Sequence, residues 1–126
     1  MGWPMSEKVK HYLSLHEKYL EEADKLLGAR DYVQASEKLW GAAAEIVKAV
    51  AAARQIELKT HEDLWSFVSK LREEMKDPEI SKLFLAANYL HQNFYEDLLP
   101  AEVVTDGLET VKQFADRLKA LTNVVS

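Results

Sequence analysis

The sequence predicts an all-α protein: a five-helix, mostly antiparallel (up-and-down) bundle that forms a single domain over residues 1–126. Apolar residues recur at i, i+3 and i+4 through most of the chain, which is the spacing of one helix face. Capping patterns and prolines divide the chain into five such segments. No stretch alternates between apolar and polar residues over the length of a strand. Because the connections are only a few residues long, successive helices should run antiparallel.

The first two helices are bounded by start and stop signals. The first begins at Ser6, a residue type that caps helix N-termini, and stops at Gly28. The second is capped by Asp31, with Gln34 three residues later to complete a capping box, and it fades near Arg54. Its apolar stripe is long, so we expect this helix to lie at the centre of the bundle. We expect the first four helices to form the main core.

The last three helices are delimited by a capping box and by prolines. The third helix opens with the capping-box pattern of residues 60–63. An Asp-Pro pair that ends at Pro78 starts the fourth helix, and Pro100 ends it. The fifth helix begins between Pro100 and Asp106, and Gly107 leaves the exact start open.

Composition excludes several classes of protein. The chain has 16 basic and 21 acidic residues, a net charge of −5, which argues against an extended nucleic-acid surface. It contains no cysteine, so a disulfide framework and a thiolate metal site are excluded. No apolar run approaches the roughly 18–20 residues of a membrane span, and the first residues do not read as a signal peptide. We therefore expect a cytoplasmic protein with no membrane contact.

The fourth helix contains a histidine inside an apolar stripe. His91 projects into the middle of this stripe, and Asn88 and Tyr95 lie three and four residues away, within reach of the ring. An unsatisfied buried polar group costs about 1–3 kcal/mol, so the imidazole must find a partner. The ring is either a hydrogen-bonded core residue or part of a site. The stripe itself comprises Ile80, Leu83, Phe84, Ala87, Leu90, Phe94 and Leu98.

Its central position predicts that the His91 ring is largely buried. The partners that we expect for it are His16, Tyr12, Asn88 or a backbone carbonyl. If the ring instead faces a cleft, His91 becomes a catalytic candidate, because a histidine near neutral pKa can shuttle protons, and Tyr95 and Asn88 are the candidates to help it.

Several segments resemble a known family. Residues 35–71 contain an alanine-rich helix with a Lys-Ala pair at 48–49, then a loop, then His61 before the next helix. This order resembles the second and third helices of HEPN-fold proteins. The segments EKLWGAA at 37–43 and LHQNFYE at 90–96 are more specifically similar to the archaeal PaREP family of small HEPN-like proteins. The resemblance covers about residues 10–120 and implies a helical bundle of HEPN type.

The resemblance also bears on activity. Active HEPN ribonucleases are metal-free endoribonucleases with an arginine followed four to six residues later by a histidine. Here Asn93 stands where that arginine is expected, and no histidine follows His91. The missing motif predicts a non-catalytic HEPN-like binding or interaction module, for a nucleotide or for a partner protein such as a nucleotidyltransferase-type antitoxin. The alternative is a divergent metal-independent endoribonuclease that uses His91.

The candidates for ligand binding are Lys48, His61, Asn93 and Glu96. A lysine can contact a nucleotide phosphate, and His61 lies in the first turn of its helix, where the helix dipole favours a neutral imidazole. We expect no cofactor and no metal, because the metal-binding spacings HxxxH and ExxH do not occur and Glu96 points away from His91.

Two helices carry a second apolar or small-residue face. On the second helix this face holds Gly41, Ala44, Ala51 and Ala52 with Lys48, and on the fourth it holds Leu85, Tyr89 and Leu99. A lone bundle would leave these faces in water. We therefore expect a homodimer through helices two and four, which pairing among HEPN-like proteins also implies. We attribute Gly41 to close packing, because glycine inside a helix costs about 1 kcal/mol relative to alanine.

Overall fold

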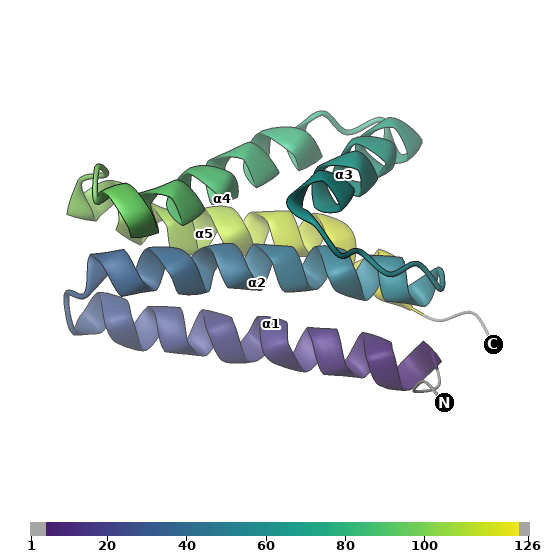
Figure 1. Cartoon of the computed structure of the whole chain (residues 1–126), viewed down its shortest axis with the longest axis horizontal. Coiled ribbons are helices and arrows are strands. Elements are labelled where there is room, and N and C mark those ends of the chain that lie inside the picture. Colours follow the sequence, from purple (N-terminus) through teal and green to yellow (C-terminus); the bar gives the residue numbers. More distant parts are fainter. Residues whose placement is uncertain (1–4, 124–126) are drawn as a thin grey trace.

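The computed structural model describes residues 5–123, which form five α-helices and a short 3₁₀-helix without any strand (Figure 1). The helices are α1 (Met5–Gly28), α2 (Tyr32–Ala53), α3 (His61–Met75), α4 (Glu79–Glu96), α5 (Ala101–Leu118) and η1 (Lys119–Thr122). In Figure 1, α2 lies between α1 on one side and α4 and α5 on the other. The all-α five-helix bundle is confirmed.

The central position of α2 follows from its composition. Of its 22 residues, 14 are buried, and many of these are alanines whose small side chains let neighbouring helices approach from several sides. Leu39, Ile46 and Val50 are fully buried in the main core. The expected central role of the second helix is confirmed.

The fifth helix belongs to the main core, which differs from the expectation that helices one to four form it. Phe114 on α5 is fully buried, and its ring stacks on Phe84 of α4 with the ring centroids 5.5 Å apart. Val104 and Val111 are fully buried as well. The strict apolar spacing of α5 places these residues on one face, and that face packs on α2 and α4.

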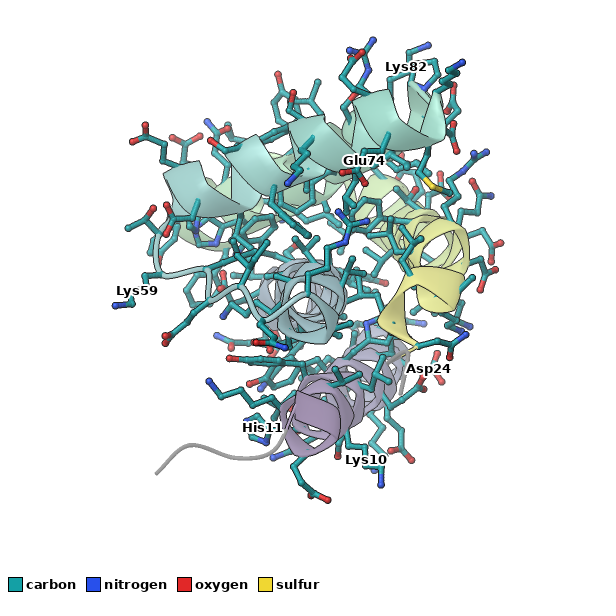
Figure 2. The ribbon with its side chains drawn as sticks, turned by 90° about the vertical axis from the view of Figure 1, so that its right-hand side faces the viewer. Lys10, His11, Asp24, Lys59, Glu74 and Lys82 are labelled. Carbon is teal, nitrogen blue, oxygen red and sulfur yellow. The ribbon has the colours of Figure 1, made fainter. Side chains whose placement is uncertain are left out.

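The third helix lies across the bundle and is the exception to the antiparallel arrangement. In Figure 2, α1 and α2 are seen end-on, whereas α3 runs sideways above them from the side of Lys59 toward Glu74. The connection 54–60 is the longest between the α-helices, and its length allows the chain to turn before α3 begins. This crossing carries the start of α3 over α2, toward α4.

The predicted caps of α2 and α3 are present, whereas α1 already begins at Met5, one residue before its predicted cap Ser6. Asp31 accepts a hydrogen bond from the backbone N–H of Gln34 at 3.2 Å. At α3 the capping box is complete: the Thr60 hydroxyl accepts from the Asp63 N–H, and the Asp63 carboxylate accepts from the N–H groups of Thr60 and Lys59. These bonds lower the pKa of Asp63, because the backbone donors stabilise its charged form.

The fourth helix ends earlier than predicted. It stops at Glu96 rather than at Pro100, because Asp97 adopts a left-handed conformation with φ 48°. The side chain of Asn93 then accepts a hydrogen bond from the Leu99 N–H at 2.7 Å, which holds the reversed chain against the helix end.

Two glycines inside helices mark close contacts. A Cβ atom on Gly41 would lie 3.1 Å from the ring of Tyr19 on α1, which confirms a packing reason for that glycine. A Cβ atom on Gly107 would lie 2.9 Å from Leu90 and 3.2 Å from Leu39. Gly107 therefore lies within α5, where it lets α5 approach both α4 and α2, and not at the start of the helix.

The two surfaces expected to form a homodimer differ in exposure. Ala44, Ala51 and Ala52 of α2 are buried within the chain itself. On α4, by contrast, Leu85 is 49% exposed and Tyr89 is 56% exposed. These α2 residues are therefore not available for a contact with a second copy. Of the two predicted dimer surfaces, only the one on α4 is exposed, and the homodimer stays a prediction.

Membrane insertion would require a long helix with an apolar surface on all sides. Among the described residues, no helix has the length and apolar content to span a bilayer.

Candidate functional site

Three aromatic rings from three helices meet at one place. Trp40 of α2, His61 at the start of α3 and His91 of α4 lie with their ring centroids 5.0–5.2 Å apart, and we call them the ring cluster. The crossing of α3 brings His61 to this place, because the capping box fixes the first turn of that helix. Trp40 is buried, whereas His61 is exposed.

His91 is held by a carboxylate on a neighbouring helix. Its Nδ1 atom lies 3.1 Å from Oε2 of Glu37 on α2, and the His91 side chain is 23% exposed. The expected partners are therefore wrong: the ring is half-buried and bonded to Glu37, which the stripe on α4 alone could not indicate. One imidazole oriented by a carboxylate and facing a second imidazole is an arrangement that can move protons.

His16 lies away from this cluster, in the interface of α1 with α2. It is fully buried, and its Nδ1 atom is 2.7 Å from the carbonyl oxygen of Ala42. Because a carbonyl only accepts, Nδ1 carries the hydrogen. The buried Nε2 atom has no partner among the described residues. His16 therefore holds α1 to α2.

Tyr95 and Asn88, the two residues predicted to assist His91, differ in their contacts with its ring. Tyr95 meets the His91 ring edge-on with the centroids 5.4 Å apart, and 72% of this tyrosine is exposed. Asn88 is half-buried, and no hydrogen bond joins it to His91 within residues 5–123. Of the two, the geometry places only Tyr95 at the ring cluster.

The other predicted ligand-binding residues fall into two groups. Lys48 and His61 line a common groove next to Trp40. Asn93 is 2% exposed and donates to the Ser36 hydroxyl at 2.8 Å while it accepts from a backbone N–H, so its polar atoms serve the fold. Glu96 is exposed at the end of α4, where it accepts from Gln92 at 3.0 Å.

Two grooves adjoin the ring cluster, and Trp40 lines both of them. The α1–α2 groove has a volume of about 350 Å³, and the α2–α3 groove has a volume of about 140 Å³. Trp40, Ala44 and Lys48 line both grooves. The α1–α2 groove is completed by Tyr19, Gln34, Glu37, Lys38, Gly41 and Glu45, and the α2–α3 groove by Leu58, Lys59, Thr60, His61 and Leu64.

Charged side chains of both signs face these grooves. Lys48 pairs with Glu45 at 3.4 Å, and Lys38 pairs with Glu22 at 2.7 Å while it lies over the Tyr19 ring. The hydrogen bond from Lys38 lowers the pKa of Glu22. Oε2 of Glu45 is buried and has no partner among the described residues, although the side chain lines the α1–α2 groove.

The donor set does not suit a metal ion. Among the described residues, no group of three His, Cys, Asp or Glu side chains is arranged to hold one.

A comparison with protein families shows which family the chain belongs to. The model of the archaeal PaREP1/PaREP8 family matches residues 11–115, which include the ring cluster and both grooves. This chain belongs to that family. The family assignment confirms the resemblance to PaREP proteins that the segments around Glu37 and His91 indicated. No curated protein is significantly similar to it.

A solved structure has the same fold. It is a crystal structure of a protein from Sulfolobus solfataricus, 28% identical, which superposes with a TM-score of 0.76. The match covers 86% of this PaREP1/PaREP8 chain and 97% of the Sulfolobus chain.

Sequence analysis of this PaREP1/PaREP8 protein missed three residues of the site. Glu37, Trp40 and Glu45 were not among the predicted binding residues, although all three lie on the α2 side of the grooves. A signal for them was present, because positions 37, 40, 44 and 48, and equally 37, 41, 45 and 48, are three or four residues apart and therefore share one helix face. That face includes Lys48, which was predicted.

Proposed function

We propose that this protein is a non-catalytic, HEPN-like binding module that takes a nucleotide-type ligand in the two grooves beside Trp40. The observation that carries the proposal is the shared lining of the grooves by Trp40 and Lys48. A ligand in either groove would touch both an aromatic ring and an ammonium group, which are the two groups that bases and phosphates require. A volume of about 350 Å³ lies within the range of small-molecule sites.

The charges support a small ligand rather than a long nucleic acid. Lys48 and Lys59 line the α2–α3 groove, whereas Lys38 and Lys48 are accompanied by Glu37 and Glu45 in the α1–α2 groove. The lysine pair of the α2–α3 groove would attract one phosphate group, and in a chain with a net charge of −5 it produces no broad basic surface. His61, at the edge of the α2–α3 groove, adds a hydrogen-bond donor for the same group.

Calorimetric titration with a panel of nucleoside mono-, di- and triphosphates tests this proposal. We expect saturable binding with no turnover, and a loss of about tenfold or more in affinity for Lys48→Ala, because a charged hydrogen bond contributes about 1.5–3 kcal/mol. Lys112→Ala, on an exposed position of α5, is the control and should bind as the wild type does. If no nucleotide binds at high micromolar concentration, the proposal is wrong.

A second candidate function is favoured by the pair of histidines. His91 is oriented by Glu37, and the His61 ring centroid lies 5.0 Å from that of His91. In a metal-independent RNA cleavage, one imidazole would take the proton of the ribose 2′-hydroxyl. The 2′-oxygen would attack phosphorus to form a 2′,3′-cyclic phosphate, and the P–O5′ bond would break. The second imidazole would give a proton to the leaving 5′-oxygen.

Cleavage of a single-stranded RNA separates this candidate from the binding module. His91→Ala and His61→Ala should each abolish cleavage, because each removes one proton carrier, while circular dichroism shows that the fold is kept. His11→Ala, on an exposed position of α1, should retain the activity. Absence of any cleavage product from the wild type excludes the ribonuclease function.

We also propose a homodimer that pairs the exposed strip of α4 with the same strip of a second copy. Tyr89 lines a largely apolar groove between α4 and α5 of about 320 Å³, and Leu85 is exposed four residues earlier on α4. A two-fold axis brings like surfaces together, so each copy would fill the other's groove. Light scattering should give twice the mass of the 14.4 kDa chain. Tyr89→Lys should reduce it to 14.4 kDa, and a wild-type protein of monomer mass at tens of micromolar contradicts the dimer.

A further inference from the structure

We infer that the α1–α2 groove recognises a guanine base, with the carboxylate of Glu45 as the acceptor for the adjacent N–H groups on the edge of the base. The inference rests on the proposed nucleotide binding and names the class of base. It depends on a feature that nucleotide binding did not use: a buried carboxylate oxygen without a partner among the described residues, on a residue that lines the α1–α2 groove.

Glu45 is an unusual residue for its place in the fold. It is 8% exposed, so more than nine-tenths of it is buried, and it lies on the central helix. Oε1 is 3.4 Å from the Lys48 ammonium, whereas Oε2 has no partner within the described residues. A buried carboxylate oxygen without a donor is unfavourable, since it has given up its bonds to water. A rotation of the Glu45 side chain toward the α1–α2 groove, which it lines, would let a ligand there supply the missing donor.

The surroundings of Glu45 select the kind of donor. Lys48 already places a positive charge beside the carboxylate, so a ligand does not need to be a cation. Tyr19 and Trp40 line the same groove, and a flat ring packs well against such side chains. The groove therefore suits a neutral, planar molecule with N–H donors.

Guanine fits this requirement better than the other bases. Its edge carries a ring N–H directly beside an exocyclic amino group, and these two parallel donors match the two oxygens of one carboxylate. Adenine and cytosine offer an amino group beside a ring acceptor, which would face the carboxylate with repulsion between lone pairs. Uracil offers a single N–H between two carbonyl acceptors.

The phosphate of the same nucleotide has a place in the α2–α3 groove, which shares Trp40 and Lys48 with the α1–α2 groove. Lys48 lines both grooves, and Lys59 and His61 line the α2–α3 groove. A guanine at Glu45 would therefore leave its sugar and phosphate to pass toward Lys48 and the α2–α3 groove. The same base could come from a free nucleotide or from a guanine in single-stranded RNA, because the recognised edge is identical.

Calorimetry with GMP, IMP and AMP tests the inference on the wild-type protein. IMP keeps the ring N–H of GMP and lacks the amino group. We expect GMP to bind at least about tenfold more tightly than AMP, with IMP between them, since a hydrogen bond to a charged group is strong. If GMP and AMP bind equally, guanine recognition is wrong while nucleotide binding stands. If none of the three binds, both proposals fail.

The Glu45→Gln variant tests whether Glu45 causes the preference for GMP over AMP. The glutamine keeps the size of the side chain but turns one acceptor into an N–H₂ donor, which would face the donors of guanine. We expect the variant to bind GMP and AMP with similar, weak affinity, and Glu109→Gln on the exposed face of α5 to keep the GMP preference. A GMP preference that survives Glu45→Gln overturns the role of Glu45.

A pair of RNA tetranucleotides separates the two sources of the base. One contains a single guanine and the other has adenine in its place. Tighter binding of the guanine-containing tetramer than of GMP identifies RNA as the source, and weaker binding identifies the free nucleotide. Equal binding of the two tetramers, together with equal binding of GMP and AMP, overturns the inference. The nucleotide comparison uses the wild-type protein and does not depend on whether a variant folds.

Discussion

The two sides of α2 show how one helix serves both the core and the site. The side toward α4 and α5 is dry, with Leu39, Ile46 and Val50 fully buried among aromatic side chains. The side that faces the grooves carries Glu45 and Lys48 between α1 and the start of α3. The dry side has every apolar group covered, whereas the grooved side leaves a buried carboxylate oxygen without a donor.

This difference separates the residues of α2 that stabilise the fold from the residues that are available to bind a ligand. Apolar burial on one side supplies the free energy that allows polar groups on the other side to remain incompletely paired. Substitutions on the dry side should therefore reduce stability strongly. Substitutions on the grooved side should change ligand binding and have smaller effects on unfolding.

The largest effect is expected at Phe114. It is fully buried and stacks on Phe84, so Phe114→Ala loses the transfer free energy of the ring and leaves a cavity. We expect the free energy of unfolding to fall by about 3–5 kcal/mol, as measured by urea denaturation. A loss below about 1 kcal/mol would show that the dry side does not dominate the stability.

Asn93 is a polar residue whose hydrogen bonds support the buried core on the dry side of α2. It donates to Ser36 and accepts from the Leu99 N–H, both in buried or half-buried positions. Asn93→Ala removes the acceptor of the Leu99 N–H and the donor to the Ser36 hydroxyl, which still donates to the Tyr32 carbonyl. We expect a loss of about 2 kcal/mol in urea denaturation. A neutral effect would reopen Asn93 as a ligand-binding residue. Gln92→Ala, in an exposed position of the same helix, is the matched control.

Urea denaturation of a His91 variant tests the grooved side of α2. Its side chain is 23% exposed and its partner Glu37 is 33% exposed, so water screens their interaction. We expect His91→Ala to lower the free energy of unfolding by less than about 1 kcal/mol. A loss comparable to that of Phe114→Ala would place His91 in the core and weaken its assignment to a site.

The smallest effect, and one that depends on pH, is expected at Asp63. Backbone N–H groups of Lys59 and Thr60 hold the pKa of Asp63 below its ordinary value of 3.8. A lowered folded-state pKa contributes stability above the ordinary value, and the contribution is lost as pH falls through the folded-state pKa. The melting temperature of the wild type should therefore exceed that of Asp63→Asn near neutral pH, and the difference should shrink below pH 3.8. A difference that is constant with pH would contradict this cause.

The sequence predicts much of this fold because local signals are strong. Thr60 and Asp63 form the predicted capping box, and the apolar spacing of α2 correctly indicates a central helix. The crossing of α3 is not predicted, because its direction depends on how the long connection 54–60 packs. Gly107 left the start of the fifth helix open in the sequence, since the reason for this glycine is its contact with Leu90 on another helix.

The site is predicted only in part, and the reason is similar. His91, His61 and Tyr95 were singled out on their own helices, but their assembly needs α3 to cross the bundle. Glu37 shares a helix face with the predicted Lys48, but its pairing with His91 was not predictable, because a contact between α2 and α4 leaves no trace in the spacing of either helix.

The central claim is that the grooved side of α2 binds a nucleotide, and Trp40 can report it directly. The chain has three tryptophans, so replacing Trp3 and Trp65 by phenylalanine leaves Trp40 as the single tryptophan, whose emission can be excited selectively over that of the tyrosines. Titration of this variant with GMP should change the Trp40 emission saturably, because Trp40 lines both grooves. The same titration after Lys48→Ala should require a much higher concentration. Emission that stays constant up to millimolar GMP, in a variant that keeps the wild-type circular dichroism spectrum, would contradict the claim.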